Sequence, residues 1–205
     1  MTVTVDELLV ADAPEAWSVA GFTVDGDLCR VGTVRIRLVG RERGLGLVGW
    51  SLRGVPEGTA DLDGVPTTAS SHPPSVAEEH ANGVTQIDHV VLLSPDLPRT
   101  VAVLEGLGVR ARRERDGELG GTAIRQVFFR LGEVILEVIG APDSAATGPA
   151  SLWGVTYVVA DLDATVELLG KSTSRVKDAV QPGRRITTLR HRDFDMSVRT
   201  ALITP

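Results

Sequence analysis

The chain contains very little cysteine and few aromatic residues. Its 205 residues include a single cysteine, Cys29, which excludes an intramolecular disulfide and a cysteine-based zinc site. Aromatic residues make up 4% of the chain, too few for the stacking platforms that bind single-stranded nucleic acid. A chain without disulfides is typical of a reducing compartment, so we expect a cytoplasmic protein.

Long apolar runs and a basic charge excess are also missing. No run approaches the roughly 18 apolar residues of a membrane-spanning helix. The N-terminus has Asp6 and Glu7 where a secretory signal would have basic residues. Residues 1–84 carry 12 acidic and 6 basic side chains, and residues 85–205 carry 15 of each. We therefore expect no nucleic-acid or membrane partner.

One irregular segment divides the chain. Residues 66–84 contain three prolines, few apolar side chains and no hydrophobic period, which predicts a linker loop. This linker separates residues 1–65 from residues 85–205. The apolar content of 42% and the charged content of 23% are those of ordinary globular proteins, so we expect both regions to fold.

The region after the linker begins with a strand, a helix and three further strands. The apolar segment 87–94 predicts the first strand. Asp96 is a suitable helix N-cap, and Gly106 ends the helical pattern. The three strands that follow are expected at residues 109–114, 123–130 and 134–139. The order of elements is therefore βαβββ.

The same order of elements then occurs a second time. Residues 151–159 predict a strand, and Asp161 caps the helix that follows. Three more strands are expected near residues 176–180, 185–190 and 197–203. The two copies are offset by 65 residues, which indicates an internal duplication. The sequence therefore predicts an α+β fold with tandem modules at residues 85–141 and 150–205.

A weaker copy of the module precedes the linker. Residues 30–40 (RVGTVRIRLVG) match residues 130–140 (RLGEVILEVIG) at four of eleven positions. Arg37 stands where the later segment has Glu137. We therefore interpret residues 1–65 as a degenerate partial module, expected to pack on or beside the main sheet.

Two segments carry a family resemblance, IDHVVLLSPDLPRTVAVLEGLG and FFRLGEVILEVIG. They resemble the vicinal-oxygen-chelate superfamily, which includes glyoxalase I, bleomycin-resistance proteins and extradiol dioxygenases. The resemblance implies that two βαβββ modules curl a mixed sheet around a cleft. It also implies, for many members, a divalent metal held there by His or Glu from the first and last strands of each module.

The resemblance assigns two candidate catalytic or metal-binding residues. His89 matches the first-strand ligand and Glu137 the fourth-strand ligand. Strand alternation of His89 with Ile87 and Val91 agrees with a position facing the cavity. The second module has Gly154 at the first position and no carboxylate in its last strand. Because catalytic metals usually have three protein ligands, we expect no tightly held cofactor.

Candidate ligand-binding residues come from the second module: Trp153, Thr156, Gln181, Arg190 and His191. Of these, Gln181 and Arg190 are suited to a carboxylate or phosphate. We expect Gly154 to leave room, making the cavity deeper on its side. Arg184 and residues 111–118 are interpreted as solvated surface.

The sequence is compatible with three functions. The preferred one is a glyoxalase-like protein, expected to be a homodimer, that binds a small, anionic organic molecule without a tightly held metal. The alternative is a divalent-metal-dependent lyase, isomerase or dioxygenase that uses His89 and Glu137, with a third ligand such as Glu7. The last is a structural protein with a vestigial cleft. The sequence leaves open whether the chain is an enzyme.

Overall fold

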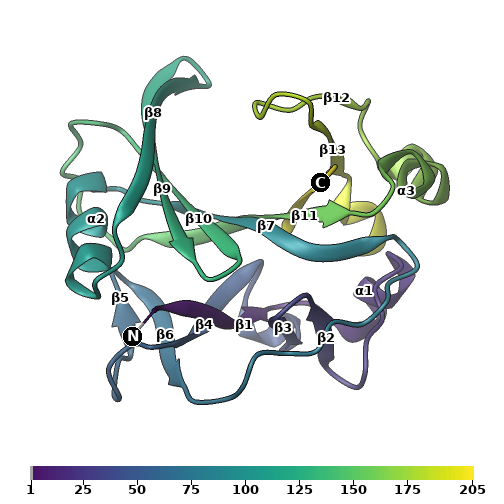
Figure 1. Cartoon of the computed structure of the whole chain (residues 1–205), viewed down its shortest axis with the longest axis horizontal. Helices are drawn as coiled ribbons and strands as arrows, with labels where there is room; N and C mark the ends of the chain where they lie inside the picture. The colour runs from purple at the N-terminus through teal and green to yellow at the C-terminus, as the bar shows by residue number, and fades with distance from the viewer. Residues whose placement is uncertain (1) are drawn as a thin grey trace.

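The computed structural model describes residues 2–205 and contains two mixed β-sheets stacked as two layers (Figure 1). The elements of the smaller sheet and its surroundings are β1 (Thr4–Val10), α1 (Pro14–Val19), β2 (Leu28–Val31), β3 (Val34–Leu38), η1 (Arg41–Arg43), β4 (Leu47–Arg53), β5 (Asp61–Leu62) and β6 (Val65–Ser70). Those of the larger sheet are β7 (Val84–Leu93), α2 (Leu97–Gly106), β8 (Ala111–Leu119), β9 (Thr122–Leu131), β10 (Val134–Gly140), β11 (Ser151–Val159), α3 (Leu162–Leu169), η2 (Gly170–Ser172), β12 (Lys177–Asp178), β13 (Arg185–Leu189), η3 (His191–Phe194) and β14 (Arg199–Ile203). No helix among the described residues is long and apolar enough to cross a membrane.

The larger sheet consists of the two predicted modules. Its eight strands run in the order β12-β13-β14-β11-β7-β10-β9-β8. The first strand of each module pairs in parallel with the last, and the two first strands, β7 and β11, pair antiparallel. Both modules therefore share one curved sheet, whose ends rise as two arms, β8 on one side and β12 with β13 on the other (Figure 1). The predicted α+β fold of tandem βαβββ modules is confirmed.

Both predicted helix caps are present. The Asp96 carboxylate accepts a hydrogen bond from the backbone N–H of Arg99 at 3.0 Å. The Asp161 carboxylate accepts from the backbone N–H groups of Asp163 and Ala164. Each carboxylate satisfies N–H groups that a helix start leaves without partners. The two capped helices, α2 and α3, lie at opposite ends of the molecule (Figure 1).

The smaller sheet is a reduced version of the larger one. Its six strands run in the order β2-β3-β1-β4-β6-β5. β1 pairs in parallel with β3 and antiparallel with β4, while β4 pairs in parallel with β6, which are the same relations as in the larger sheet. The N-terminal region thus holds two shortened units rather than one. The loop expected from residue 66 begins later, because residues 66–70 belong to β6, and the proposed domain boundaries stay a prediction.

A β-bulge in β7 decides which residues face the core. Ile87 pairs with Tyr157 and His89 pairs with Thr156, so Asp88 is an extra residue on β7. Ile87 is buried in the core between the sheets, where the Tyr157 ring packs against Phe22. The predicted alternation of His89 with Ile87 on one face is therefore wrong. The bulge instead turns His89 to the opposite face, away from the core.

Candidate functional site

A cavity of about 500 Å³ lies on the larger sheet, over β7 to β11. Its walls combine apolar side chains with polar ones. The apolar part consists of Val91, Leu93, Ile124, Ile139 and Trp153. The polar part consists of His89, Arg115, Asp116, Glu118, Gln126, Glu137 and Thr156. A volume of this size is typical of small-molecule sites.

The bulge residue Asp88 fixes the orientation of His89. Asp88 Oδ2 accepts a hydrogen bond from His89 Nδ1 at 2.7 Å, and Asp88 Oδ1 accepts one from Arg184 Nη1 at 2.7 Å. Burial raises the pKa of Asp88, but the hydrogen bonds from His89 and Arg184 together outweigh burial and lower it. Asp88 is therefore ionised at neutral pH. Its oxygen needs a donor, so His89 carries a proton on Nδ1 and presents Nε2 to the cavity.

Glu137 is held from the other side of the cavity. Its Oε1 accepts a hydrogen bond from Gln126 Nε2, and Gln126 Oε1 accepts one from Arg115 Nε at 2.8 Å. Its Oε2 lies 3.6 Å from His89 Nε2. Arg115 belongs to the β8 arm and Arg184 to the β12–β13 hairpin. Each arm of the sheet thus supplies one guanidinium that orients one member of the His89–Glu137 pair.

Four of the predicted site residues share the cavity: His89, Glu137, Trp153 and Thr156. The first two face each other, as strand position implied. Trp153 is 42% exposed, and the Arg199 guanidinium lies 4.9 Å from its ring centre. The structure establishes where these side chains lie, while their catalytic or binding roles stay predictions.

Three other predicted residues lie outside the cavity lining. Gln181 is exposed in the turn between β12 and β13. β13 ends at Leu189, so strand alternation does not reach Arg190, which is exposed beside η3. His191 begins η3, and burial, together with the charges of Arg192 and Arg199, lowers its pKa.

Several residues of the site are not predicted by the sequence. Its pattern predicts solvated surface for residues 111–118, yet Arg115 and the end of this segment line the cavity because β8 curls over it (Figure 1). Arg184 was assigned to a solvated turn, yet it binds Asp88. The position of Asp88 directly before His89 was an available signal. The link to Arg184, 96 residues away, had no local signal.

Gly154 does not deepen the cavity. A Cβ built at this position would lie 2.8 Å from the backbone oxygen of Arg199 and 3.2 Å from its Cβ. The space that the sequence suggested is therefore filled by β14. Glycine is needed at Gly154 so that β11 and β14 can approach closely.

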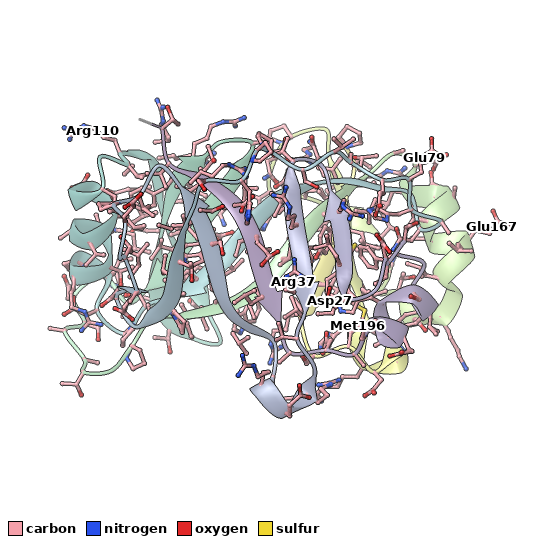
Figure 2. All side chains as sticks on the ribbon, turned by 90° about the horizontal axis from the view of Figure 1, so that it is seen from below. Asp27, Arg37, Glu79, Arg110, Glu167 and Met196 are labelled. Carbon is pink, nitrogen blue, oxygen red and sulfur yellow. The ribbon has the colours of Figure 1, made fainter. Side chains whose placement is uncertain are left out.

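The residues present do not fit the divalent metal that the resemblance implied. Among residues 2–205, no group of three or more His, Cys, Asp or Glu side chains is arranged to hold a metal ion. His89 and Glu137 supply two donor atoms, and both oxygens of Asp88 are engaged. Glu7, the suggested third ligand, is paired with Arg37 in the smaller sheet. Figure 2, viewed from the side of that sheet, shows Arg37 over its strands.

Comparisons with known proteins agree with this architecture. No curated protein sequence matches the chain. A mutant of 4-hydroxymandelate synthase from Streptomyces coelicolor is 15% identical with a TM-score of 0.65, over 99% of this chain and 92% of that one. A xylose isomerase-like TIM barrel/4-hydroxyphenylpyruvate dioxygenase fusion protein is 14% identical with a TM-score of 0.63, over 100% of this chain and 49% of that one. At such identities the likeness shows the fold alone.

The family assignment comes from the sequence. Residues 88–188 match the family model described as Glyoxalase/Bleomycin resistance protein/Dioxygenase superfamily. The matched segment begins at the bulge of β7 and ends in β13, so it contains every residue that lines the cavity. Together with the two modules in one curved sheet, this match shows that the region of residues 88–188 belongs to the glyoxalase/bleomycin resistance protein/dioxygenase superfamily.

Proposed function

We propose that the protein binds a small organic molecule in the cavity of the larger sheet, without a tightly held metal. The observation that carries the proposal is the His89–Glu137 pair, fixed from opposite arms and facing each other across 3.6 Å. Sites for small molecules are mostly apolar with a few oriented polar groups, and this cavity has that composition. The pair would hold the polar end of the ligand, and the apolar walls would cover its body.

The proposal omits the anionic charge that the sequence suggested. That expectation rested on Gln181 and Arg190, which lie outside the cavity lining. The guanidinium of Arg184 donates to Asp88 and to the backbone oxygen of Thr204 instead of lining the cavity. Gln181, Arg184 and Arg190 therefore do not support an anionic ligand in this cavity.

The number of donors supports the proposal that no metal is tightly held. Two protein ligands leave a divalent ion mostly water-bound, whereas catalytic sites usually supply three. The alternative is a metal-dependent lyase, isomerase or dioxygenase, which needs a third donor. The second module places Thr156 opposite His89, and Thr156 carries no carboxylate or imidazole.

A thermal-shift screen with small organic compounds tests the proposal. A ligand at 100 times its Kd stabilises the protein by about 2.7 kcal/mol. For a chain of this length that corresponds to a rise in Tm of roughly 5–10 °C. We expect Glu137→Gln to abolish the rise, whereas Glu167→Gln, on the exposed face of α3, should preserve it. Failure of every compound, or equal rises in both variants, would contradict the proposal.

Metal content separates the two functions. We expect protein purified without chelators to contain far less than one equivalent of divalent metal, measured by elemental analysis. Stoichiometric metal that disappears in Glu137→Gln would favour the metal-dependent enzyme. The predicted homodimer stays a prediction that light scattering can test.

A further inference from the structure

The hydrogen bonds around the His89–Glu137 pair favour a ligand that donates hydrogen bonds to it. His89 Nδ1 donates to Asp88, so a ring that carries a single proton presents the lone pair of Nε2. Glu137 Oε1 already accepts from Gln126, and Oε2 faces Nε2. Two acceptors therefore lie 3.6 Å apart at the cavity wall. A single atom that carries two or more hydrogens can lie about 2.9 Å from both acceptors.

The charged side chains that line the cavity also bear on the choice of ligand. Three carboxylates line the cavity, those of Asp116, Glu118 and Glu137, against one guanidinium, that of Arg115. Arg115 Nε is engaged with Gln126. Asp116 is neutralised by Arg125 at 2.7 Å, but Arg125 itself does not line the cavity. A cationic ligand is therefore favoured over an anionic one.

The geometry and the charge point to one ligand class, and this inference rests on the proposed function. We propose that the cavity binds a primary ammonium compound with an apolar body. The ammonium group donates to His89 Nε2 and Glu137 Oε2. The body packs against the apolar walls formed by Val91, Ile139 and Trp153.

Three probes of similar shape distinguish this ligand class from the others. The probes are 2-phenylethylamine, 2-phenylethanol and 3-phenylpropionate, which end in an ammonium, a hydroxyl and a carboxylate group. Each is titrated into the full-length protein at pH 8 and followed by NMR, using the indole N–H of Trp153 and the side-chain amide of Gln126. We expect the amine to bind at least about tenfold more tightly than the other two, because hydrogen bonds to charged groups contribute more than neutral ones.

Two variants test the assignment to the pair. We expect Glu137→Gln to weaken binding of the amine at least tenfold and to remove its advantage over the alcohol. Glu167→Gln also removes one carboxylate charge, but on α3 at the end of the molecule (Figure 2). This variant should leave the order of affinities of the three probes unchanged. If Glu137→Gln fails to fold, the ranking of the three probes on the wild type still tests the inference.

The outcomes separate the inference from the proposed function. If the alcohol or the carboxylate shifts the cavity signals at least as strongly as the amine, the ammonium class is overturned and the small-molecule site stands. If no probe shifts these signals, the inference is overturned as well, and the wider thermal-shift screen decides the proposed function on its own.

Discussion

Replacing Asp88 with Asn should destabilise the protein in a pH-dependent way. The Asp88 side chain is 8% exposed and accepts two hydrogen bonds of 2.7 Å, one from His89 and one from Arg184. Hydrogen bonds to charged groups contribute about 1.5–3 kcal/mol each. Asparagine keeps one acceptor oxygen but turns its NH₂ group toward a donor. We therefore expect the free energy of unfolding to fall by about 2–4 kcal/mol at pH 7.

The sign of the pH dependence follows from the lowered pKa of Asp88. A carboxylate whose pKa is lower in the folded than in the unfolded state stabilises the fold above its unfolded pKa of about 3.9. That contribution is lost as the pH falls through the folded pKa. The difference between wild type and Asp88→Asn should therefore be full at pH 7 and shrink below about pH 4.

Urea unfolding followed by tryptophan fluorescence measures this difference at pH 7 and at pH 3. The matched control is Asp116→Asn, which also removes the charge of an arginine-paired aspartate. The Asp116 side chain is 70% exposed, so solvent screens its pair with Arg125 and the loss should be much smaller. Equal losses for the two variants, or a loss for Asp88→Asn that is as large at pH 3 as at pH 7, would refute the reasoning.

Three further predictions concern packing, reactivity and capping. Gly154→Ala should destabilise by about 1–3 kcal/mol, because its methyl group meets the backbone of Arg199. Gly106→Ala, where the methyl group meets nothing within 4 Å, should leave the stability of the protein unchanged or raise it. Equal urea midpoints for the Gly154→Ala and Gly106→Ala variants would contradict this contrast. Burial raises the pKa of Cys29 to about 12, so iodoacetamide at pH 8 should label it only in urea, and rapid labelling of the native protein would count against this. Asp161→Ala should cost about 1 kcal/mol in urea unfolding, and no loss would show that the cap is not needed.

The fold could be predicted because its signals are local. Asp96 and Asp161 mark the helix starts, and the apolar alternation of the neighbouring segments marks the strands. The match between residues 30–40 and 130–140 even extends to the turns, where Gly32 and Gly132 both have positive φ. Local patterns of this kind depend on a few neighbouring residues, so the sequence displays them directly.

The site was only partly predictable because its geometry depends on partner strands. A bulge is defined by the residue opposite it, so nothing in β7 alone distinguishes Asp88 as the extra residue. Strand alternation predicts that His89 and Ile87 both face the cavity. His89 does face it, whereas Ile87 is buried in the core. Arg184 and Arg115 reach the site because the arms curl, which the strand pattern does not encode.

The duplicated sheet shows how two residue differences close such a site. In β1, Asp6 is an extra residue between the pairs formed by Val5 and Glu7, in the same way that Asp88 is in β7. Glu7 thus occupies the place of His89, and Arg37 stands where the larger sheet has Glu137. Glu7 and Arg37 form an ion pair at 3.1 Å, so donor and acceptor satisfy each other and leave no acceptor pair for a ligand.

The smaller sheet also lacks the arms that enclose a cavity. Its outermost strands, β2 and β5, have four and two residues, whereas the larger sheet ends in the nine-residue β8 on one side and in the paired strands β12 and β13 on the other. With no arm to curl over the sheet, Asp6 is instead covered by the side chains of Arg35 and Arg53. The same backbone framework therefore holds a closed polar network in one layer and the His89–Glu137 pair beside a cavity in the other. Because the bulge is common to both, the open site depends on the residues His89 and Glu137 and on the length of the arms.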